Sequence, residues 1–202
     1  MLLKFFKRHI PTFITIIVIL AVWQIWADVA SINPLLLPSP LGIAQSMVYA
    51  MPTLWPAMAI TIEESVIGFI LAIICGITLG IVCYSSKILR SSIFPILYAA
   101  QTMPLISIAP ILLLWFGFEI SGKIVIVAIF GLFPIAVQTI RGLQAVPRYY
   151  SDVALTCGAT QTWTLWHVKL RVAGHSIFGG IRIAGAYTIA TATTAEYLGS
   201  RG

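Results

Sequence analysis

Charged residues are scarce in this chain of 202 residues, where Asp, Glu, Lys and Arg together make up 9%. A soluble domain of ordinary composition carries about 25%. The deficit is matched by a hydrophobic content of 59% and a mean hydropathy of +1.00. Together these values indicate an integral membrane protein.

Acidic residues and cysteines are the scarcest chemical groups. The chain has 6 acidic and 12 basic residues, which gives a net charge of +6. The basic residues are scattered between apolar runs, so they do not predict binding to nucleic acid. Cys75, Cys83 and Cys157 have neither CxxC nor metal-type spacing. We therefore expect no disulfide and no metal site.

What the chain does contain is long apolar runs. A bilayer core of about 30 Å requires roughly 20 helical residues. The third of the expected membrane spans is interrupted at Pro104 and Pro110, and the last is the most polar. The five spans are predicted at residues 11–27, 60–84, 93–116, 123–139 and 177–198. This pattern predicts an all-α, polytopic helix bundle that forms one domain over residues 1–202.

The basic residues predict the orientation of the bundle. With the N-terminus in the cytoplasm and five alternating spans, two basic residues, Lys123 and Arg201, fall outside. The positive-inside rule favours this arrangement, and the first apolar run lacks a signal-peptide cleavage site. The ten basic residues placed inside are Lys4, Lys7, Arg8, Lys87, Arg90, Arg141, Arg148, Lys169, Arg171 and Arg182.

Two connections between the spans are long. The external one, 31–56, contains five prolines that are expected to break it into turns, with a short interfacial helix at 41–50. The internal one, 141–174, predicts two short amphipathic helices joined at Gly158, which suits a left-handed cap. This pair is either a surface hairpin or a docking element for a cytoplasmic partner.

The second of these short helices has its own signals. Thr160 can cap it, and Trp163, Trp166 and Leu170 are spaced to share one side of it. In the first helix, the apolar face runs from Tyr150 to Cys157. Neither helix is long enough to span the bilayer.

The internal loop also resembles a known motif. The loop reads Asp152-Val153-Ala154, three residues, Gly158, nine residues and Val168-x-Leu170. This pattern is similar to the EAA motif of permease subunits of binding-protein-dependent ABC importers, which reads Glu-Ala-Ala, three residues, Gly, nine residues and Ile-x-Leu-Pro. The residue after the motif is Arg171 where the family has proline, which leaves the end of the second helix open. The resemblance implies coupling to an ATPase through Asp152, Ala154, Gly158, Val168 and Leu170.

Further stretches resemble the nitrate/sulfonate/taurine branch of this family, and within it permeases for pyrimidine precursors of thiamine. They are "LLLPSP" (35–40), "GFILAIICGITLGI" (68–81), "QTMPLISIAPILLLWFG" (101–117) and "AEYLG" (195–199). Permeases of this family usually continue into a sixth helix after the last stretch. The resemblance therefore implies a C-terminally truncated chain whose C-terminus lies outside.

The resemblance also implies partners and a location. The chain would be a multi-pass cell-membrane (inner-membrane) subunit that pairs with a second permease subunit, either a second copy in a homodimer or a different subunit in a heterodimer. A cytoplasmic ATPase dimer would drive it, and an external binding protein would deliver the solute. No cofactor and no catalytic residue is expected in the chain itself. The expected solute is a small heterocycle, with nitrate, taurine or aliphatic sulfonates as alternatives. The alternatives from other functional classes are a membrane receptor that does not transport a solute and an intramembrane enzyme.

Polar residues inside the spans are candidates for the transport path. Tyr187, Thr191 and Thr194 recur at i, i+4 and i+7, so they form one hydroxyl stripe. Such a stripe either lines a path or packs against neighbouring helices. Gln101 and Thr102 precede a mid-span proline, where they either satisfy a freed backbone carbonyl or face a cavity.

Other polar features have simpler interpretations. Residues 117–123 fit the first seven positions of a phosphate-binding loop, but Ile124 stands where Ser or Thr is required, so we interpret them as a turn between spans. Glu63, Glu64 and Glu196 lie near the outer ends of spans. Because a carboxylate in lipid is costly, we expect them to face water, a partner or the pore mouth, or to lie at the interface.

Overall fold

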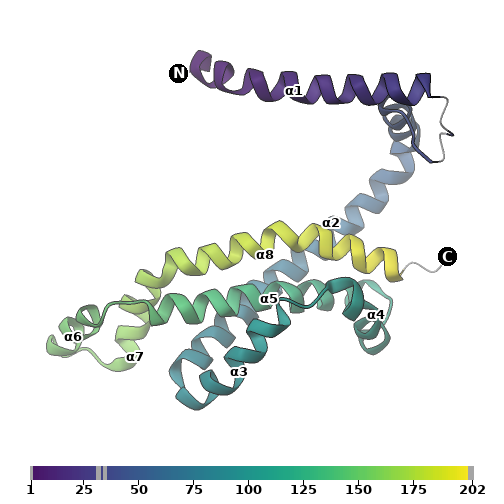
Figure 1. Cartoon of the computed structure of the whole chain (residues 1–202). Coiled ribbons are helices and arrows are strands. Elements are labelled where there is room, and N and C mark those ends of the chain that lie inside the picture. Colours follow the sequence, from purple (N-terminus) through teal and green to yellow (C-terminus); the bar gives the residue numbers. More distant parts are fainter. Residues whose placement is uncertain (1, 31–32, 34–35, 200–202) are drawn as a thin grey trace. The chain divides into compact units, whose positions relative to one another are not determined.

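The computed structural model describes residues 2–30, 33 and 36–199, and each regular element within them is a helix (Figure 1). The prediction of an all-α bundle is confirmed. Contacts divide the chain into two compact units, Met1–Ala57 and Met58–Gly202. The two units are described separately below.

The first unit holds α1 (Leu2–Val29) and the beginning of α2 (Pro40–Ser85). The segment Ile10–Val29 is long and apolar enough to cross a membrane, as the sequence predicts for the first span. The end of α1 is tied to the start of α2 because the side chain of Gln24 accepts a hydrogen bond from the backbone N–H of Leu41 at 3.0 Å.

The prediction that prolines break residues 31–56 into turns is wrong for its second half. Helix α2 continues through Pro52 and Pro56 without interruption. Each proline removes one backbone donor, but the remaining hydrogen bonds of a long helix hold its path. The short helix expected at 41–50 is present as the first part of α2, whereas Pro34 lies outside the described residues.

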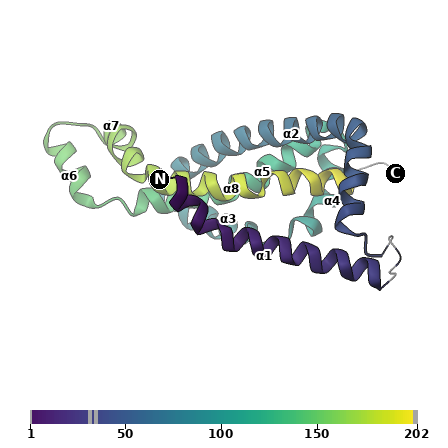
Figure 2. The same cartoon turned by 90° about the horizontal axis from the view of Figure 1, so that it is seen from above.

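The second unit is built on two long antiparallel helices, α5 (Ile120–Gln144) and α8 (Leu170–Gly199), which lie side by side in both views (Figures 1 and 2). The helices α6 and α7 lie at one end of this pair, and α4 lies at the other. The remaining elements are α3 (Lys87–Ala100), α4 (Leu105–Phe116), α6 (Arg148–Thr156), α7 (Gln161–Thr164) and the π-helical turn η1 (Leu165–Lys169).

The centre of this unit is α5, which packs against its neighbours on several sides. Ile140 is wholly buried in a cluster shared with α2 and α3, and Ile135 in one shared with α2 and α8. Ile126 is wholly buried with residues of α4 and α8. The outer surface of the unit remains apolar, as expected for helices that face lipid or partner helices.

Small residues let α2 approach α5 closely. Gly68, Gly76 and Gly80 are buried on one face of α2 at multiples of four residues. A Cβ atom at Gly76 would lie 2.8 Å from the Cβ of Ile135, and one at Gly80 would lie 2.6 Å from the Cβ of Thr139. Packing of this kind drives helix association in membranes, where the solvent is as apolar as the side chains.

Among its described residues, the structure has three helices that could span a membrane, or four if a bent pair counts as one, where the sequence predicts five. Helices α1, α2 and α5 are each long and apolar enough to cross a membrane, and α3 with α4 would form a fourth span bent by 110°. The interruption expected at Pro104 is present, but the one at Pro110 is wrong because α4 continues through it. The predicted fifth span is a helix within α8, which is too polar to stand among these candidates.

The stretch 117–123, which fits part of a phosphate-binding loop, connects α4 to α5. Gly117 has φ +92°, and a Cβ atom at Gly122 would lie 2.0 Å from the carbonyl oxygen of Gly117. Glycine fits both positions best. The interpretation as a turn holds for 117–119, whereas 120–123 form the first turn of α5.

Candidate functional site

A cavity of about 570 Å³ lies between the α3–α4 turn and α8. The sequence analysis missed its apolar lining, which includes Met103, Phe130 and Ile183, because these residues read as ordinary membrane-facing positions. All five residues predicted to lie along a path contribute to its wall, namely Gln101, Thr102, Tyr187, Thr191 and Thr194. Two segments about 90 residues apart in the sequence thus form one site.

The α3–α4 turn fixes the hydroxyl of Thr102. It donates a hydrogen bond to the carbonyl of Ala99 at 2.7 Å. The carbonyl of Ala100, which Pro104 leaves without its helical donor, accepts instead from the N–H of Met103 at 3.2 Å. Thr102 also lines the cavity. The two roles are compatible because a hydroxyl oxygen that donates its proton keeps its lone pairs free to accept.

The hydroxyl stripe on α8 has the same property. The hydroxyl of Thr191 donates to the carbonyl of Tyr187 at 2.9 Å, and that of Thr194 donates to the carbonyl of Ala190 at 2.7 Å. Thr191 is buried, whereas Tyr187 is 65% exposed. Their donors are occupied, so these threonines offer the cavity hydrogen-bond acceptors.

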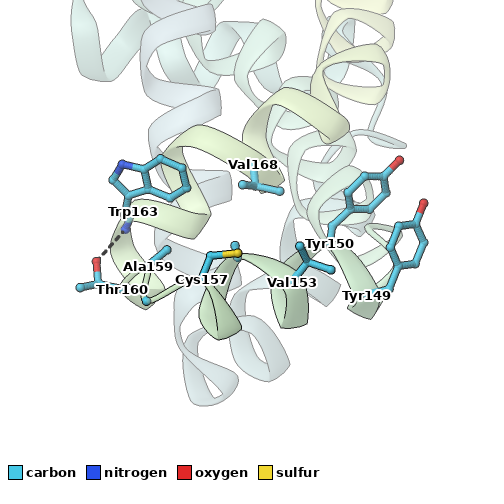
Figure 3. Close-up of a pocket in the computed structure, with 10 residues that line it drawn as sticks. Tyr149, Tyr150, Val153, Cys157, Ala159, Thr160, Trp163 and Val168 are labelled. Atoms are coloured by element: carbon cyan, nitrogen blue, oxygen red, sulfur yellow. Dashed lines mark hydrogen bonds between the residues drawn. The ribbon is translucent and has the colours of Figure 1, made fainter.

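A second cavity, of about 880 Å³, is an apolar groove between α6 and the α7–η1 segment (Figure 3). In the view shown, Val168 lies above Val153 and Cys157 of α6, with Trp163 on one side and Tyr150 on the other. The side chains of Val153 and Trp163 are 61% and 48% exposed. Apolar side chains that line an open groove outside the membrane-spanning helices mark an interaction site.

Backbone geometry holds the groove open. Gly158 has φ +86°, its N–H donates to the carbonyl of Leu155, and the N–H of Ala159 donates to that of Ala154, both at 3.0 Å. These bonds form a Schellman motif, which ends α6 and turns the chain back. Thr160 then caps α7 by accepting from the N–H of Trp163 at 3.2 Å. The predicted left-handed glycine and the predicted threonine cap are both confirmed.

The groove is uncharged, and its aromatic residues are held in place. The rings of Trp163 and His167 stack with centroids 4.6 Å apart. The rings of Tyr149 and Tyr150 stack at 4.2 Å. A hydrogen bond with Tyr150 raises the pKa of Tyr149 above its ordinary value, so this phenol is neutral in the physiological range.

The residues of the predicted motif do not all meet in one place. Ala154, Gly158 and Val168 line the groove. Asp152 instead lines a polar cavity of about 360 Å³, and Leu170 packs into the core between α5 and α8. The structure therefore brings together three of the five residues.

The face predicted for the second short helix is wrong. The sequence spacing placed Trp163, Trp166 and Leu170 on one side, but only Trp163 lines the groove, and Trp166 is 57% exposed elsewhere. The cause is the π-helical turn η1, which widens the helix and changes the angle between successive side chains. The second helix is also not separate, since α7 and η1 continue into α8.

Of the positions expected for Glu64, the one that faces water is wrong, because its side chain is buried within the protein. Glu64 is wholly buried, and its Oε1 lies 3.4 Å from Nζ of Lys123. Glu196 is partly buried and accepts a hydrogen bond from the hydroxyl of Thr61 at 2.9 Å. Glu63 is exposed, as expected. The protein itself thus supplies a polar partner for two of these carboxylates.

This arrangement defines a class of protein: a multi-pass helical membrane protein with an uncharged cavity among its helices and an apolar groove at one end. Residues 68–202 match the model of the family described as "Binding-protein-dependent transport system inner membrane component". The chain belongs to this family. It is therefore a permease subunit of an ABC importer, and the predicted family is confirmed.

Its relatives transport chemically different solutes. The chain is 31% identical to formylaminopyrimidine transport permease protein ThiX of Halalkalibacterium halodurans, over 91% of this chain and 74% of the relative. It is 28% identical to riboflavin transport system permease protein RibX of Chloroflexus aurantiacus, over 93% and 71%. It is also 28% identical to taurine transport system permease protein TauC of Escherichia coli, over 91% and 70%. The names alone do not select a solute for this chain.

Proposed function

We propose that this permease subunit carries a small, uncharged nitrogen heterocycle through the cavity between the α3–α4 turn and α8. The observation that carries the proposal is the convergence of all five predicted path residues on that one cavity. A pyrimidine precursor of thiamine is the solute that fits best. The alternatives are the anionic or zwitterionic solutes nitrate, taurine and aliphatic sulfonates.

The charge of the lining supports a neutral solute. None of the described residues that line the cavity is Lys, Arg, His, Asp or Glu. Sulfonate and nitrate groups are bound best by cationic donors, and an apolar site without such donors leaves an anion without compensation for its lost hydration. The lining therefore disfavours taurine, sulfonates and nitrate.

The hydrogen-bonding groups of the lining support a heterocycle that carries N–H donors. Thr102, Thr191 and Thr194 present acceptor oxygens because their own protons are bound to backbone carbonyls. Gln101 adds an amide that can both donate and accept. Tyr187 and Phe130 offer ring faces on which a flat heterocycle can stack. An aminopyrimidine matches this combination.

Partners complete the transporter. The cavity wall includes side chains that are exposed in the single chain, among them Tyr187 (65% exposed) and Met103 (52% exposed). A second copy of the chain, packed as a homodimer, would cover this face and close the path. An external binding protein would deliver the solute at the end of the bundle near Lys123.

A cytoplasmic ATPase dimer would supply the energy by docking at the groove between α6 and η1. The groove lies at the end of the second unit that carries Lys87, Arg90, Arg141, Arg148 and Lys169, here named the basic end. The positive-inside rule favours a cytoplasmic location for such an end, and Lys4, Lys7 and Arg8 independently favour one for the N-terminus. The ATPase would bury Val153 and Trp163, either with an amphipathic helix that enters the groove or with a groove of its own that receives these side chains.

The test of the path uses Thr191→Val, which keeps the shape of the side chain and removes its acceptor oxygen. Loss of one hydrogen bond is worth about 1 kcal/mol, so uptake of the pyrimidine at limiting concentration should fall about fivefold. The measurement is uptake into proteoliposomes that contain the complete transporter. Basal ATP hydrolysis and subunit assembly should not change.

The matched control is Thr193→Val, two residues away on the exposed side of α8 and absent from the cavity wall. It should transport like the parent protein. Equal uptake by Thr191→Val and the parent protein would contradict the proposal that Thr191 lines the transport path. Dissociation of the complex by Thr191→Val, but not by Thr193→Val, would show that the hydroxyl stripe is packing.

A further inference from the structure

A polar cavity at the basic end has no place in the function proposed above. It has a volume of about 360 Å³ and, in the part of the chain that the structure describes, shares no lining residue with the apolar groove. Three basic side chains from three different elements line it: Arg90 of α3, Arg148 of α6 and Lys169 of η1. One carboxylate, that of Asp152, lines it as well. The formal charge of the lining is therefore positive.

The three cations lack anionic partners. Within the described residues, none of these three side chains has a carboxylate oxygen within 4.0 Å. Lys169 is held by a neutral group instead, since its Nζ donates to the hydroxyl of Tyr84 at 3.2 Å and lies 5.6 Å from the centre of that ring. Three cations against the one carboxylate of Asp152 leave an excess of positive charge in the lining, which favours an anionic occupant.

The position of the cavity fits an anion at the membrane surface. Tyr84 and Arg90 flank the point where α2, a candidate membrane span, ends at Ser85. A second cavity, of about 540 Å³, shares Arg90 and Gln144 with the first. Lys87 and Ser91 form the rest of its polar side, and Ile88, Phe94 and Pro95 of α3 form an apolar wall. A basic pocket that continues along an apolar wall matches a molecule with an anionic head and a hydrocarbon tail.

We propose that these two cavities bind one anionic phospholipid. Its phosphate lies among Arg90, Arg148 and Lys169, and the start of an acyl chain lies along Phe94 and Ile88, which is 78% exposed. Arginine pairs with phosphate oxygens through two parallel N–H groups, and basic pockets between helices on the cytoplasmic side are the usual place for acidic headgroups. A free phosphate would satisfy the cations but would leave the apolar wall of Ile88, Phe94 and Pro95 uncovered.

The consequence is a link between lipid and the loop that forms the groove. The phosphate would join α3, which follows a candidate span, to α6 and η1, which form the walls of the groove. An anionic lipid should therefore hold the groove in place. This inference does not depend on the identity of the solute or on the ATPase.

The experiment measures binding of phosphatidylglycerol to the purified full chain in detergent, by native mass spectrometry. Phosphatidylcholine with the same acyl chains is the neutral comparison, and inorganic phosphate tests the headgroup alone. Phosphatidylglycerol should bind, phosphatidylcholine should bind at least tenfold more weakly, and phosphate should not compete at millimolar concentration. Each basic side chain near an anionic lipid contributes about fivefold in affinity.

Variants locate the site. Arg90→Gln should weaken phosphatidylglycerol binding about fivefold, and Asp152→Asn should strengthen it. The matched control is Arg171→Gln, which removes the same charge from an exposed residue that lines neither cavity. If Arg90→Gln and Arg171→Gln weakened phosphatidylglycerol binding equally, the binding would reflect general electrostatic attraction rather than this cavity, which would overturn the proposal. Competition by inorganic phosphate would indicate that the cavity binds a free anion. Absence of phosphatidylglycerol binding would indicate that the cavity binds an acidic side chain of a partner. Either result overturns the proposal.

Discussion

Replacing Gly158 with valine is expected to abolish association with the partner ATPase while the helix bundle still inserts in the membrane. The backbone of Gly158 has φ +86°, and its N–H closes the Schellman motif that ends α6. A left-handed conformation costs an ordinary residue about 1–2 kcal/mol, and a β-branched residue adopts it least readily. The chain would escape the strain by turning elsewhere, and the two walls of the groove would separate.

Two further variants isolate the cause of that loss. Gly174→Val makes the same change on α8, where a Cβ atom would meet nothing within 4 Å and φ is not positive, so co-purification of the ATPase should persist. Gly158→Asn should retain most of the association, because asparagine tolerates the left-handed region. The docking role would be wrong if Gly158→Val co-purified with the ATPase as well as the parent protein does.

Replacing Lys123 with methionine should cause the largest loss of stability in the second unit. The Nζ of Lys123 lies 3.4 Å from the carboxylate of Glu64, which has 0% of its side chain exposed. Removing one partner of a buried pair leaves the other charge uncompensated and costs about 3–5 kcal/mol. Thermal unfolding in detergent should therefore shift to a clearly lower temperature.

The double variant Glu64→Leu/Lys123→Met tests whether the loss comes from an unpaired buried charge or from the change of side chain at position 123. A buried ion pair can often be replaced by apolar residues of similar volume without loss, so the double variant should recover most of the stability. Lys87→Met is the matched control, since Lys87 is exposed, and it should unfold like the parent protein. Unchanged stability of Lys123→Met would contradict the importance of the pair.

The helical class and the site residues could be predicted because each depends on local pattern. Tyr187, Thr191 and Thr194 share a face through helical spacing alone, and the polar pair before Pro104 marks a helix break. That these two segments line one cavity follows from the packing of α3, α4 and α8 around α5, which no local pattern contains.

The errors have equally physical origins. A proline predicts the end of a helix, but Pro52, Pro56 and Pro110 lie inside helices, where the remaining backbone hydrogen bonds hold the helix together. The π-helical turn at Leu165–Lys169 leaves no mark in the spacing of apolar residues, so Trp166 was assigned to the wrong face. The partner of Glu64 lies 59 residues away on α5, beyond the reach of any local pattern.

The central claim is that the groove between α6 and η1 lies in the cytoplasm and is covered by an ATPase. Cys157 tests it directly, because this thiol is exposed and lines the groove, whereas Cys83 is buried and Cys75 lies within an apolar helix. A membrane-impermeant maleimide should label Cys157 in inside-out vesicles and not in right-side-out vesicles. Binding of the ATPase should then protect it. Labelling of Cys157 from the external side, or labelling at an undiminished rate with the ATPase bound, would contradict the account.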